Sequence, residues 1–432
     1  MLQPIIAGVI GALTGFASSF ALVIAGLLAV GASPADAASG LLALCIGQAV
    51  LAGLLSWRFR LPLSFAWSTP GAALLVAAEG TTGSYGSAIG AFLVCGLLIL
   101  ISGLWPWLGR AMTRIPMPLA GAMLAGILFP ICIAPVTAVL QEPLLAAPVI
   151  IVWLLLVRWL PRWAVPAAML VAIIGVVVSA GDTWMTTATL APTLTLTMPT
   201  LDPLVIASLG VPLYIVTMAG QNVPGFAVLT TLGYRDVPSR VVLVASGAAT
   251  ALTAPFGGYA LNLAALTAAL MAGLDSHPDM TRRWVAPIAG GATYVLLGLG
   301  AGVATALVSA APPILIIAVA GLALLGAFTT GLVSAFEAPE TRLTAAVTLI
   351  VVASGIVVLG IGSAFWGLLV GALVMLVTRP RRAAREPVAA PPTAPPTEPP
   401  TEPPTGAPAR GVGSGSLEQR RPLPCRPPLR PV

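Results

Sequence analysis

The chain has 432 residues, of which 58% are apolar and 8% are charged, and its mean hydropathy is +1.01. A soluble core needs far less apolar surface, and apolar runs of about 18 residues or more recur, which predicts an all-α polytopic membrane protein in a lipid bilayer. The net charge of +6 comes from arginines in short loops and the C-terminal tail rather than from a basic stripe. A nucleic acid is therefore not an expected partner.

Apolar windows bounded by charges or by Pro and Gly predict fourteen membrane segments. The first seven cover residues 5–30, 36–56, 62–79, 85–108, 117–140, 143–160 and 163–180. The second seven cover residues 203–232, 239–253, 255–272, 284–309, 312–332, 341–358 and 361–378. We expect a periplasmic connecting loop at 182–202 between two repeats, 1–181 and 203–379. The Pro/Arg-rich remainder, 380–432, is predicted to be a disordered cytoplasmic tail.

Charge alternates between successive loops, and this alternation supports the count of segments. Loops after even-numbered segments carry arginines such as Arg58, Arg110 and Arg158, whereas loops after odd-numbered segments of the first half carry acids such as Asp36 and Glu142. The positive-inside rule then places the arginine-bearing loops and both termini in the cytoplasm. Two halves of seven segments, an odd number, must be inverted relative to each other, which predicts a 7+7 inverted repeat.

Two of the predicted segments are interrupted at corresponding places in the two halves. The stretch Leu252–Leu270, which contains most of the tenth, breaks at Pro255–Gly258, and the third breaks at Ser68, Thr69, Pro70 and Gly71. Irregular backbone at membrane depth is tolerated only inside protein or beside a wet cavity, and paired interruptions point to a central binding site. Half-helices beginning near Gly71 and Gly258 would aim partial positive charge at that site. A re-entrant loop, a simple proline kink or a chance likeness of two Pro/Gly-rich stretches is the alternative interpretation.

Uncharged polar and aromatic side chains inside the predicted segments are the candidate ligands, because polar groups in a membrane are costly. Gln221 and Asn222 stand before a Pro-Gly pair and offer donors and acceptors without net charge. Their structural alternative is helix–helix hydrogen bonding, worth about 1 kcal/mol. Ser18 and Ser19 could instead bond to carbonyls of their own helix. The other substrate-binding candidates, some of which could simply pack, are Phe16, Ser68, Thr69, Pro70, Gly71, Phe256, Gly257, Gly258, Tyr259 and Asn262.

Enzymatic chemistry is not expected from this sequence. The single histidine, His277, lies in a loop and cannot serve a nucleophile inside the membrane. There is no His or carboxylate cluster for a metal and no phosphate-binding loop for ATP, so we expect neither a metal nor a cofactor. No carboxylate is clearly placed to relay a proton at the midplane.

At these motifs the sequence resembles the benzoate transporter (BenE) family of proton symporters. The stretches that carry the resemblance are 15–20, 66–73, 220–226, 253–258 and 262–268, and the resemblance spans about residues 1–380. It implies a multi-pass carrier of the bacterial inner membrane that imports benzoate with a proton, and the fold family suggests a homodimer.

The family is similar to the nucleobase transporters, in which the third and tenth segments each combine a short strand with a half-helix and substrate binds between them. Those carriers use glutamates on the eighth and tenth segments. In the corresponding parts of its eighth and tenth segments this chain has Gln221, Asn222, Tyr259 and Asn262. Nucleobase transport is therefore less expected, and the proton-coupling residue stays undefined.

Together these features predict secondary active uptake of benzoate or a similar aromatic monocarboxylate with a proton, by alternating access. The carboxylate would bind half-helix N-termini and the amides of Gln221, Asn222 and Asn262, and the proton would travel on the substrate or along water. Replacing Gln221 or Asn262 with leucine should then abolish uptake at normal membrane levels. A nucleobase or other small-anion symporter of the same fold is the alternative, and an anion channel is a further one.

Overall fold

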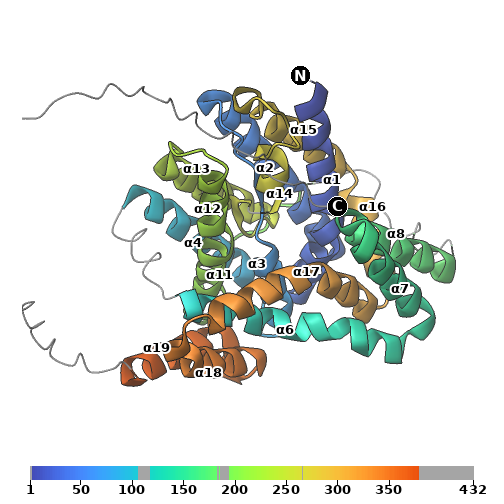
Figure 1. Ribbon diagram of the computed structural model, residues 1–432. Coiled ribbons are helices and arrows are strands. Elements are labelled where there is room, and N and C mark those ends of the chain that lie inside the picture. The colour runs from blue at the N-terminus through green and yellow to red at the C-terminus, as the bar shows by residue number, and fades with distance from the viewer. Residues whose placement is uncertain (1, 106–116, 182–183, 185–193, 265, 379–432) are drawn as a thin grey trace, which may run out of the picture. The chain divides into compact units, whose positions relative to one another are not determined.

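The computed structural model describes residues 2–105, 117–181, 184, 194–264 and 266–378. The chain divides into two units, Met1–Arg379 and Pro380–Val432. Helices make up most of the first unit (Figure 1). The predicted tail, 380–432, lies outside the described residues.

The first half contains seven helices and one short strand in its described part. They are α1 (Leu2–Ala29), α2 (Pro34–Phe59), β1 (Phe65–Trp67), α3 (Thr69–Ala77), α4 (Tyr85–Leu104), α6 (Met117–Gln141), α7 (Pro143–Trp159) and α8 (Pro161–Ala180). The start of α2 has a capping box: Ser33 Oγ accepts from the Asp36 N–H at 3.2 Å, and the Asp36 carboxylate accepts from the Ser33 N–H at 3.2 Å.

The second half begins with one long helical rod that widens to a π-helical turn at two places. It runs through α10 (Pro203–Val205), a π-helical turn (Ile206–Gly210), α11 (Val211–Thr217), a second π-helical turn (Met218–Asn222) and α12 (Val223–Thr231). The Pro224–Gly225 pair that follows the two amides does not interrupt this rod. The wider i→i+5 turn, in which the Val223 N–H donates to the Met218 carbonyl, carries the helix past Pro224 without a break.

The remaining elements follow in chain order. They are α13 (Ser239–Thr253), a 3₁₀ turn (Ala254–Phe256), β2 (Leu261–Leu263), α14 (Leu266–Ala272), a 3₁₀ turn (Met280–Arg282), α15 (Val285–Leu299), α16 (Ala301–Ala310), α17 (Pro313–Phe336), a 3₁₀ turn (Pro339–Thr341), α18 (Arg342–Ala353), the hairpin β3 (Val357–Val358) and β4 (Ile361–Gly362), and α19 (Ser363–Thr378). The buried Arg283 donates to the carbonyls of Ala272, His277 and Pro278 and so holds together the loop between α14 and α15.

A helix was predicted over 255–272 with a restart near Gly258, and the structure corrects this. After the 3₁₀ turn, Gly257 takes a positive φ of 94°, the chain becomes extended, and the next helix begins only at Leu266. Asn262 therefore lies on a strand and not on a half-helix. An isolated strand in a membrane would leave backbone groups unpaired, and β1, inside the predicted segment 62–79, supplies the partner.

Eight helices in the described part of the chain are long and apolar enough to cross a membrane, and the pair Met280–Leu299 and Ala301–Ala310, bent by 57°, would make a ninth. The prediction of a polytopic helical membrane protein is thus confirmed. Segments such as α3 and α14 are too short to be counted by length, so fourteen segments in an inverted repeat stay a prediction.

Small residues stand where the helices cross, as expected for helix packing in lipid. A Cβ at Gly247 of α13 would lie 2.3 Å from the Leu100 N of α4, and one at Gly8 of α1 would lie 2.1 Å from the Ala286 carbonyl oxygen of α15. The helices α6 and α17 also lie side by side (Figure 1), and a Cβ at Gly121 would lie 2.7 Å from the Gly331 carbonyl oxygen. Main chains thus approach too closely for any larger side chain.

Candidate functional site

The two strands pair across the two halves of the chain and form a short antiparallel ribbon. Phe65 lies opposite Leu263, Ala66 opposite Asn262, and Trp67 opposite Leu261. Two further backbone bonds lengthen the ribbon at its ends, from Ser68 N to Ala260 O and from Ala264 N to Ser64 O, both 2.9 Å. The ribbon leads directly into α3.

Side chains from neighbouring helices satisfy the outer edge of β2, whose amides point away from β1. The Leu261 N–H donates to the Thr250 hydroxyl of α13 at 2.9 Å, and the Leu263 N–H donates to Asn222 Oδ1 at 3.0 Å. The Asn222 Nδ2 lies 3.3 Å from the Met218 sulfur, and the residue is fully buried. Asn222 therefore holds the ribbon against the rod 203–231.

Replacing Asn222 with leucine is expected to lower stability, because the buried Leu263 N–H would lose its acceptor at a cost of about 1–3 kcal/mol. The thermal unfolding midpoint of the purified protein should fall relative to that of Gln141→Leu, which removes an exposed amide at the end of α6. Equal midpoints for the two variants would contradict this structural role.

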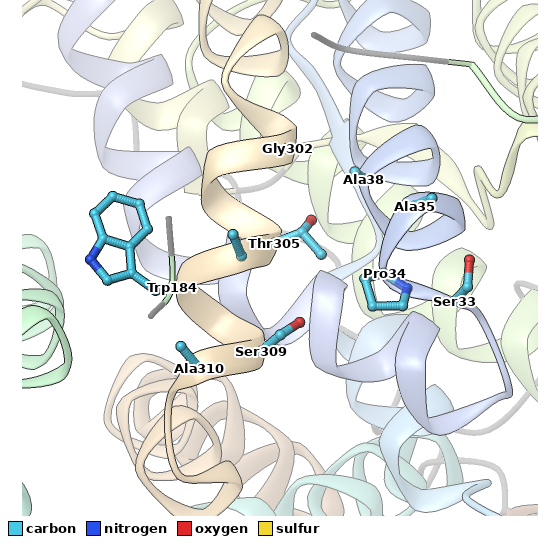
Figure 2. A pocket seen from close by; sticks show the side chains of 10 residues that line it. Ser33, Pro34, Ala35, Ala38, Trp184, Gly302, Thr305, Ser309 and Ala310 are labelled. Carbon is cyan, nitrogen blue, oxygen red and sulfur yellow. The ribbon is translucent and has the colours of Figure 1, made fainter. Parts of the chain in front are cut away.

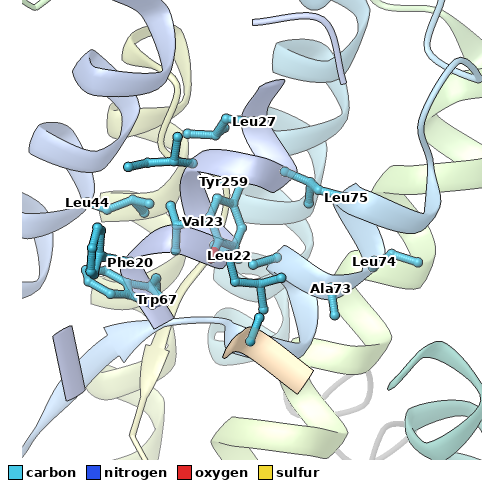
Figure 3. Packing of buried hydrophobic residues seen from close by; sticks show 14 of the residues in the cluster. Phe20, Leu22, Val23, Leu27, Leu44, Trp67, Ala73, Leu74, Leu75 and Tyr259 are labelled. Atoms are coloured by element: carbon cyan, nitrogen blue, oxygen red, sulfur yellow. The ribbon is translucent and has the colours of Figure 1, made fainter. Parts of the chain in front are cut away.

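Ser68 ties the first turn of α3 to two other parts of the protein. Its hydroxyl accepts from the Gly71 N–H at 3.1 Å and from the Thr217 hydroxyl of α11 at 2.9 Å. Its carbonyl accepts from the Tyr259 hydroxyl at 3.1 Å. Tyr259 is fully buried and belongs to the same apolar cluster as Leu22 of α1 and Leu75 of α3, shown in Figure 3.

Gln221 differs from its neighbour Asn222 in having a free side chain. It is half-buried and forms no side-chain hydrogen bond with the residues that the structure describes. The adjacent Gly220 has its Cβ position 3.8 Å from Pro70 Cγ, so the π-helical turn lies against the first turn of α3. Thr69, in that first turn, is also half-buried. These residues form the least enclosed polar part of the predicted site.

Asn262 leaves one polar atom without a partner. Its Nδ2 donates to the Leu263 carbonyl at 3.0 Å, but its Oδ1 is buried and has no hydrogen-bond partner. A buried acceptor without a donor is unusual in folded proteins and marks a place where a ligand or water could bind.

The predicted residues of α1 face Trp67 of β1. Ser18 and Ser19 both donate to the Gly15 carbonyl, at 2.9 and 3.0 Å, and Ser19 also accepts from Trp67 Nε1 at 3.0 Å. Phe16 stacks on Phe20 with ring centroids 5.0 Å apart and meets the Trp67 ring edge-on at 5.9 Å. The serines thus bond mainly within the protein, and the aromatic rings form a wall beside the ribbon.

The structure places Phe256, Gly257 and Gly258 away from this wall. Ser39 Oγ of α2 donates to the Phe256 carbonyl at 2.9 Å, and a Cβ on Gly257 would come within 2.9 Å of the Gly40 Cα. They lie beside the first turns of α2, and no helix begins at Gly258. The expected second half-helix starts at Leu266 instead.

Several polar residues near the ribbon were not among the sequence candidates. The Ser64 and Thr267 hydroxyls lie 2.7 Å apart, the Tyr294 ring of α15 meets Trp67 edge-on at 5.7 Å, and Thr217 and Thr250 bond as described above. Gln48 lies on α2, which packs against both strands, and neither of its buried amide atoms has a partner. The signal that could have found Gln48 is its position as the lone amide of an apolar helix.

Among the described residues, the buried charged side chain is that of Arg283, in the loop between α14 and α15. No charged side chain in the described part of the chain is buried at this site. The described residues also contain no cluster of His, Cys, Asp or Glu that could hold a metal. Recognition here must depend on backbone dipoles, amides, hydroxyls and aromatic rings.

Solved membrane transporters share the arrangement of these elements. The transmembrane domain of a cyanobacterial bicarbonate transporter, BicA, matches with a TM-score of 0.51 at 14% identity over 88% of this chain and 98% of that one. The murine anion transporter Slc26a9 matches with a TM-score of 0.56 at 12% identity over 86% of this chain and 68% of that one. At such identities the likeness establishes the fold alone, that of a membrane transporter.

The sequence defines the family within that class. Residues 1–377 match the BenE family, described as benzoate membrane transport protein. Inner membrane protein YdcO of Escherichia coli (strain K12) is 37% identical over 375 residues, 86% of this chain and 95% of that protein. The benzoate membrane transport protein of Acinetobacter baylyi is 33% identical over 345 residues, 79% of this chain and 86% of that protein. The chain belongs to the BenE family of membrane transport proteins and is not an enzyme.

Proposed function

We propose that the chain imports benzoate or a similar aromatic monocarboxylate together with a proton, by alternating access around the ribbon. The named relative from Acinetobacter baylyi motivates the substrate. The observation that carries the proposal is the position of the free Gln221 amide. It lies on the π-helical turn that packs against the start of the nine-residue helix α3, and we call Gln221, Thr69 and this helix start the polar group around α3.

The chemistry of this group suits a carboxylate that must be released again. The start of α3 carries partial positive charge, which favours an anion, and the Gln221 Nε2 can donate a hydrogen bond. An arginine there would favour the bare anion, whereas this charge-free setting also admits the protonated acid. The aromatic wall of Phe16 and Trp67 provides flat apolar surface for the ring.

A proton would accompany the substrate itself. The orphan Asn262 Oδ1 is an acceptor, and a protonated carboxyl group has a hydroxyl that can donate to it. This assignment needs no protein carboxylate at the midplane, and none is buried among the described residues.

The same proposal includes the membrane topology. We infer fourteen segments in two inverted repeats of seven, in which β1 with α3 corresponds to β2 with α14. The pairing of the two strands at the centre supports this correspondence. Both termini lie in the cytoplasm, and the membrane is the bacterial inner membrane. The homodimer stays a prediction.

Uptake of labelled benzoate by proteoliposomes, with and without an imposed inward proton gradient, tests the function. The expected result is concentrative uptake that depends on the gradient and is inhibited by excess benzoate but not by uracil or bicarbonate. Uptake that only equilibrates across the membrane would indicate a channel, and inhibition by uracil would indicate a nucleobase carrier.

A further inference from the structure

A cavity of about 530 Å³ lies apart from the ribbon, between the start of α2 and α16. Its walls are Ser33, Pro34, Ala35 and Ala38 on one side, and Gly302, Thr305, Ala306, Ser309, Ala310 and Trp184 on the other. Figure 2 shows the side chains of Thr305 and Ser309 extending from α16 toward the first turn of α2. The small residues on both helices leave this space open.

The cavity joins three parts of the chain that the topology places on the same side of the membrane. Ser33 follows α1, Ser309 is close to the end of α16, and Trp184 belongs to the connection between the two halves. All three connections were predicted to be periplasmic from the arginine pattern alone. The cavity therefore opens at the end from which an imported substrate arrives.

The lining selects against an anion. It contains three hydroxyl groups and one indole but no basic side chain. The Asp36 carboxylate, in the first turn of α2, already accepts from the N–H and hydroxyl of the lining residue Ser33. The helices α1, α16 and α17 carry no charged residue. A negative ligand would thus meet repulsion from Asp36 without a compensating cation.

Thr305 provides an independent sign that a polar ligand belongs here. The residue is 2% exposed, and its hydroxyl has no hydrogen-bond partner. Helical threonines elsewhere in the chain, such as Thr293 and Thr329, donate to carbonyls of their own helix at 2.9 and 2.8 Å. Thr305 lines the cavity but makes no such bond, and a ligand carbonyl or hydroxyl that reached its buried hydroxyl would satisfy it.

We propose that this cavity is an outer entry site that takes the aromatic acid in its neutral, protonated form. The carboxyl carbonyl accepts from Thr305, the carboxyl hydroxyl donates to Ser309 or Ser33, and the ring lies against Trp184 and the alanine surface. The proton stays on the substrate throughout this step. The identity of the ligand rests on the function proposed above.

The test uses benzamide, a neutral ligand with the same ring, a carbonyl acceptor and an N–H donor. The background chain has Cys132 and Cys425 replaced by serine, and it keeps Cys45 and Cys95 because both are buried. In this background, Ser309→Cys places an exposed thiol at the cavity. At neutral pH, saturating benzamide is expected to slow maleimide labelling of the full-length protein about fivefold or more, and the same concentration of benzoate anion should protect much less. Ser354→Cys, an exposed thiol at the end of α18, is the control whose labelling should not change.

A second substitution separates binding from folding. Thr305→Val removes an unsatisfied hydroxyl with little change in shape, so the unfolding midpoint should stay the same or rise. Benzamide protection should nevertheless be lost, and the KM for benzoate uptake should rise. Thr329→Val, on α17, should change neither quantity.

The outcomes for the two proposals differ. If the chain imports benzoate but benzamide does not slow labelling of the Ser309→Cys variant, the entry site alone is overturned. Equal protection by benzoate anion and benzamide overturns selection of the neutral form. Absence of benzoate uptake by the natural sequence overturns the proposed function, whatever the labelling shows.

Discussion

Replacing Gln221 with leucine is expected to reduce benzoate uptake about tenfold or more, corresponding to about 1.4 kcal/mol or more of lost interaction. The amide is half-buried and bonds to no described residue, so its removal leaves no protein group unsatisfied. The loss should therefore appear in transport while the amount of folded protein in the membrane stays constant.

Uptake rates normalised to membrane levels, measured beside Gln141→Leu, provide the check. Gln141 offers the same side chain at an exposed helix end, and its replacement should leave uptake unchanged. Full activity of Gln221→Leu would show that the polar group around α3 does not contact the substrate.

Replacing Gly247 with valine is expected to prevent folding. The added Cβ would lie 2.3 Å from the Leu100 N and 2.7 Å from the Gly96 carbonyl oxygen, and both are backbone atoms that cannot rotate away. The helices α4 and α13 would have to separate, which costs about 3 kcal/mol or more by comparison with overpacked cores. Because α13 also carries Thr250, separation would remove an acceptor from β2.

Size-exclusion profiles of detergent-solubilised protein measure this effect, with Gly326→Val as the matched control. Gly326, on α17, has nothing within 4 Å of its Cβ position, so a valine there has room. A normal monodisperse peak for Gly247→Val would contradict the close approach of the two helices.

Hydropathy, together with the positions of prolines and glycines, predicts most helices well. Residues 239–253 were predicted as one helix and form α13 with the same bounds, because Pro238 precedes the first residue and Pro255 follows closely after the last. Fully buried segments give no such guidance on conformation. Residues 258–264 are buried on all sides, and periodicity cannot distinguish a buried strand from a buried helix.

There is a second reason why local sequence does not predict the ribbon. A strand inside a membrane is stable only when a partner strand pairs with its backbone groups. The partner of Leu261–Leu263 lies in the other half of the chain. Only the resemblance to a family with strands in these segments anticipated it.

The two adjacent amides show the limit of prediction at the candidate site. Gln221 and Asn222 are chemically similar, and the sequence offered both as ligands. The π-helical turn decides between them, because it directs Asn222 to the Leu263 N–H and leaves Gln221 without a partner. No local pattern predicts which of two neighbouring residues such a turn will bury.

The ribbon also constrains the order in which the protein can be made. The backbone of β1 needs partners from β2, about 200 residues later, which at about 5–20 residues per second means roughly 10–40 s of synthesis. During that interval the groups of Phe65–Trp67 cannot rest unpaired in lipid, so this stretch must wait in water, in the insertion machinery or against other nascent helices. The centre of the transporter is therefore completed only after β2, in the second half of the chain, has emerged from the ribosome.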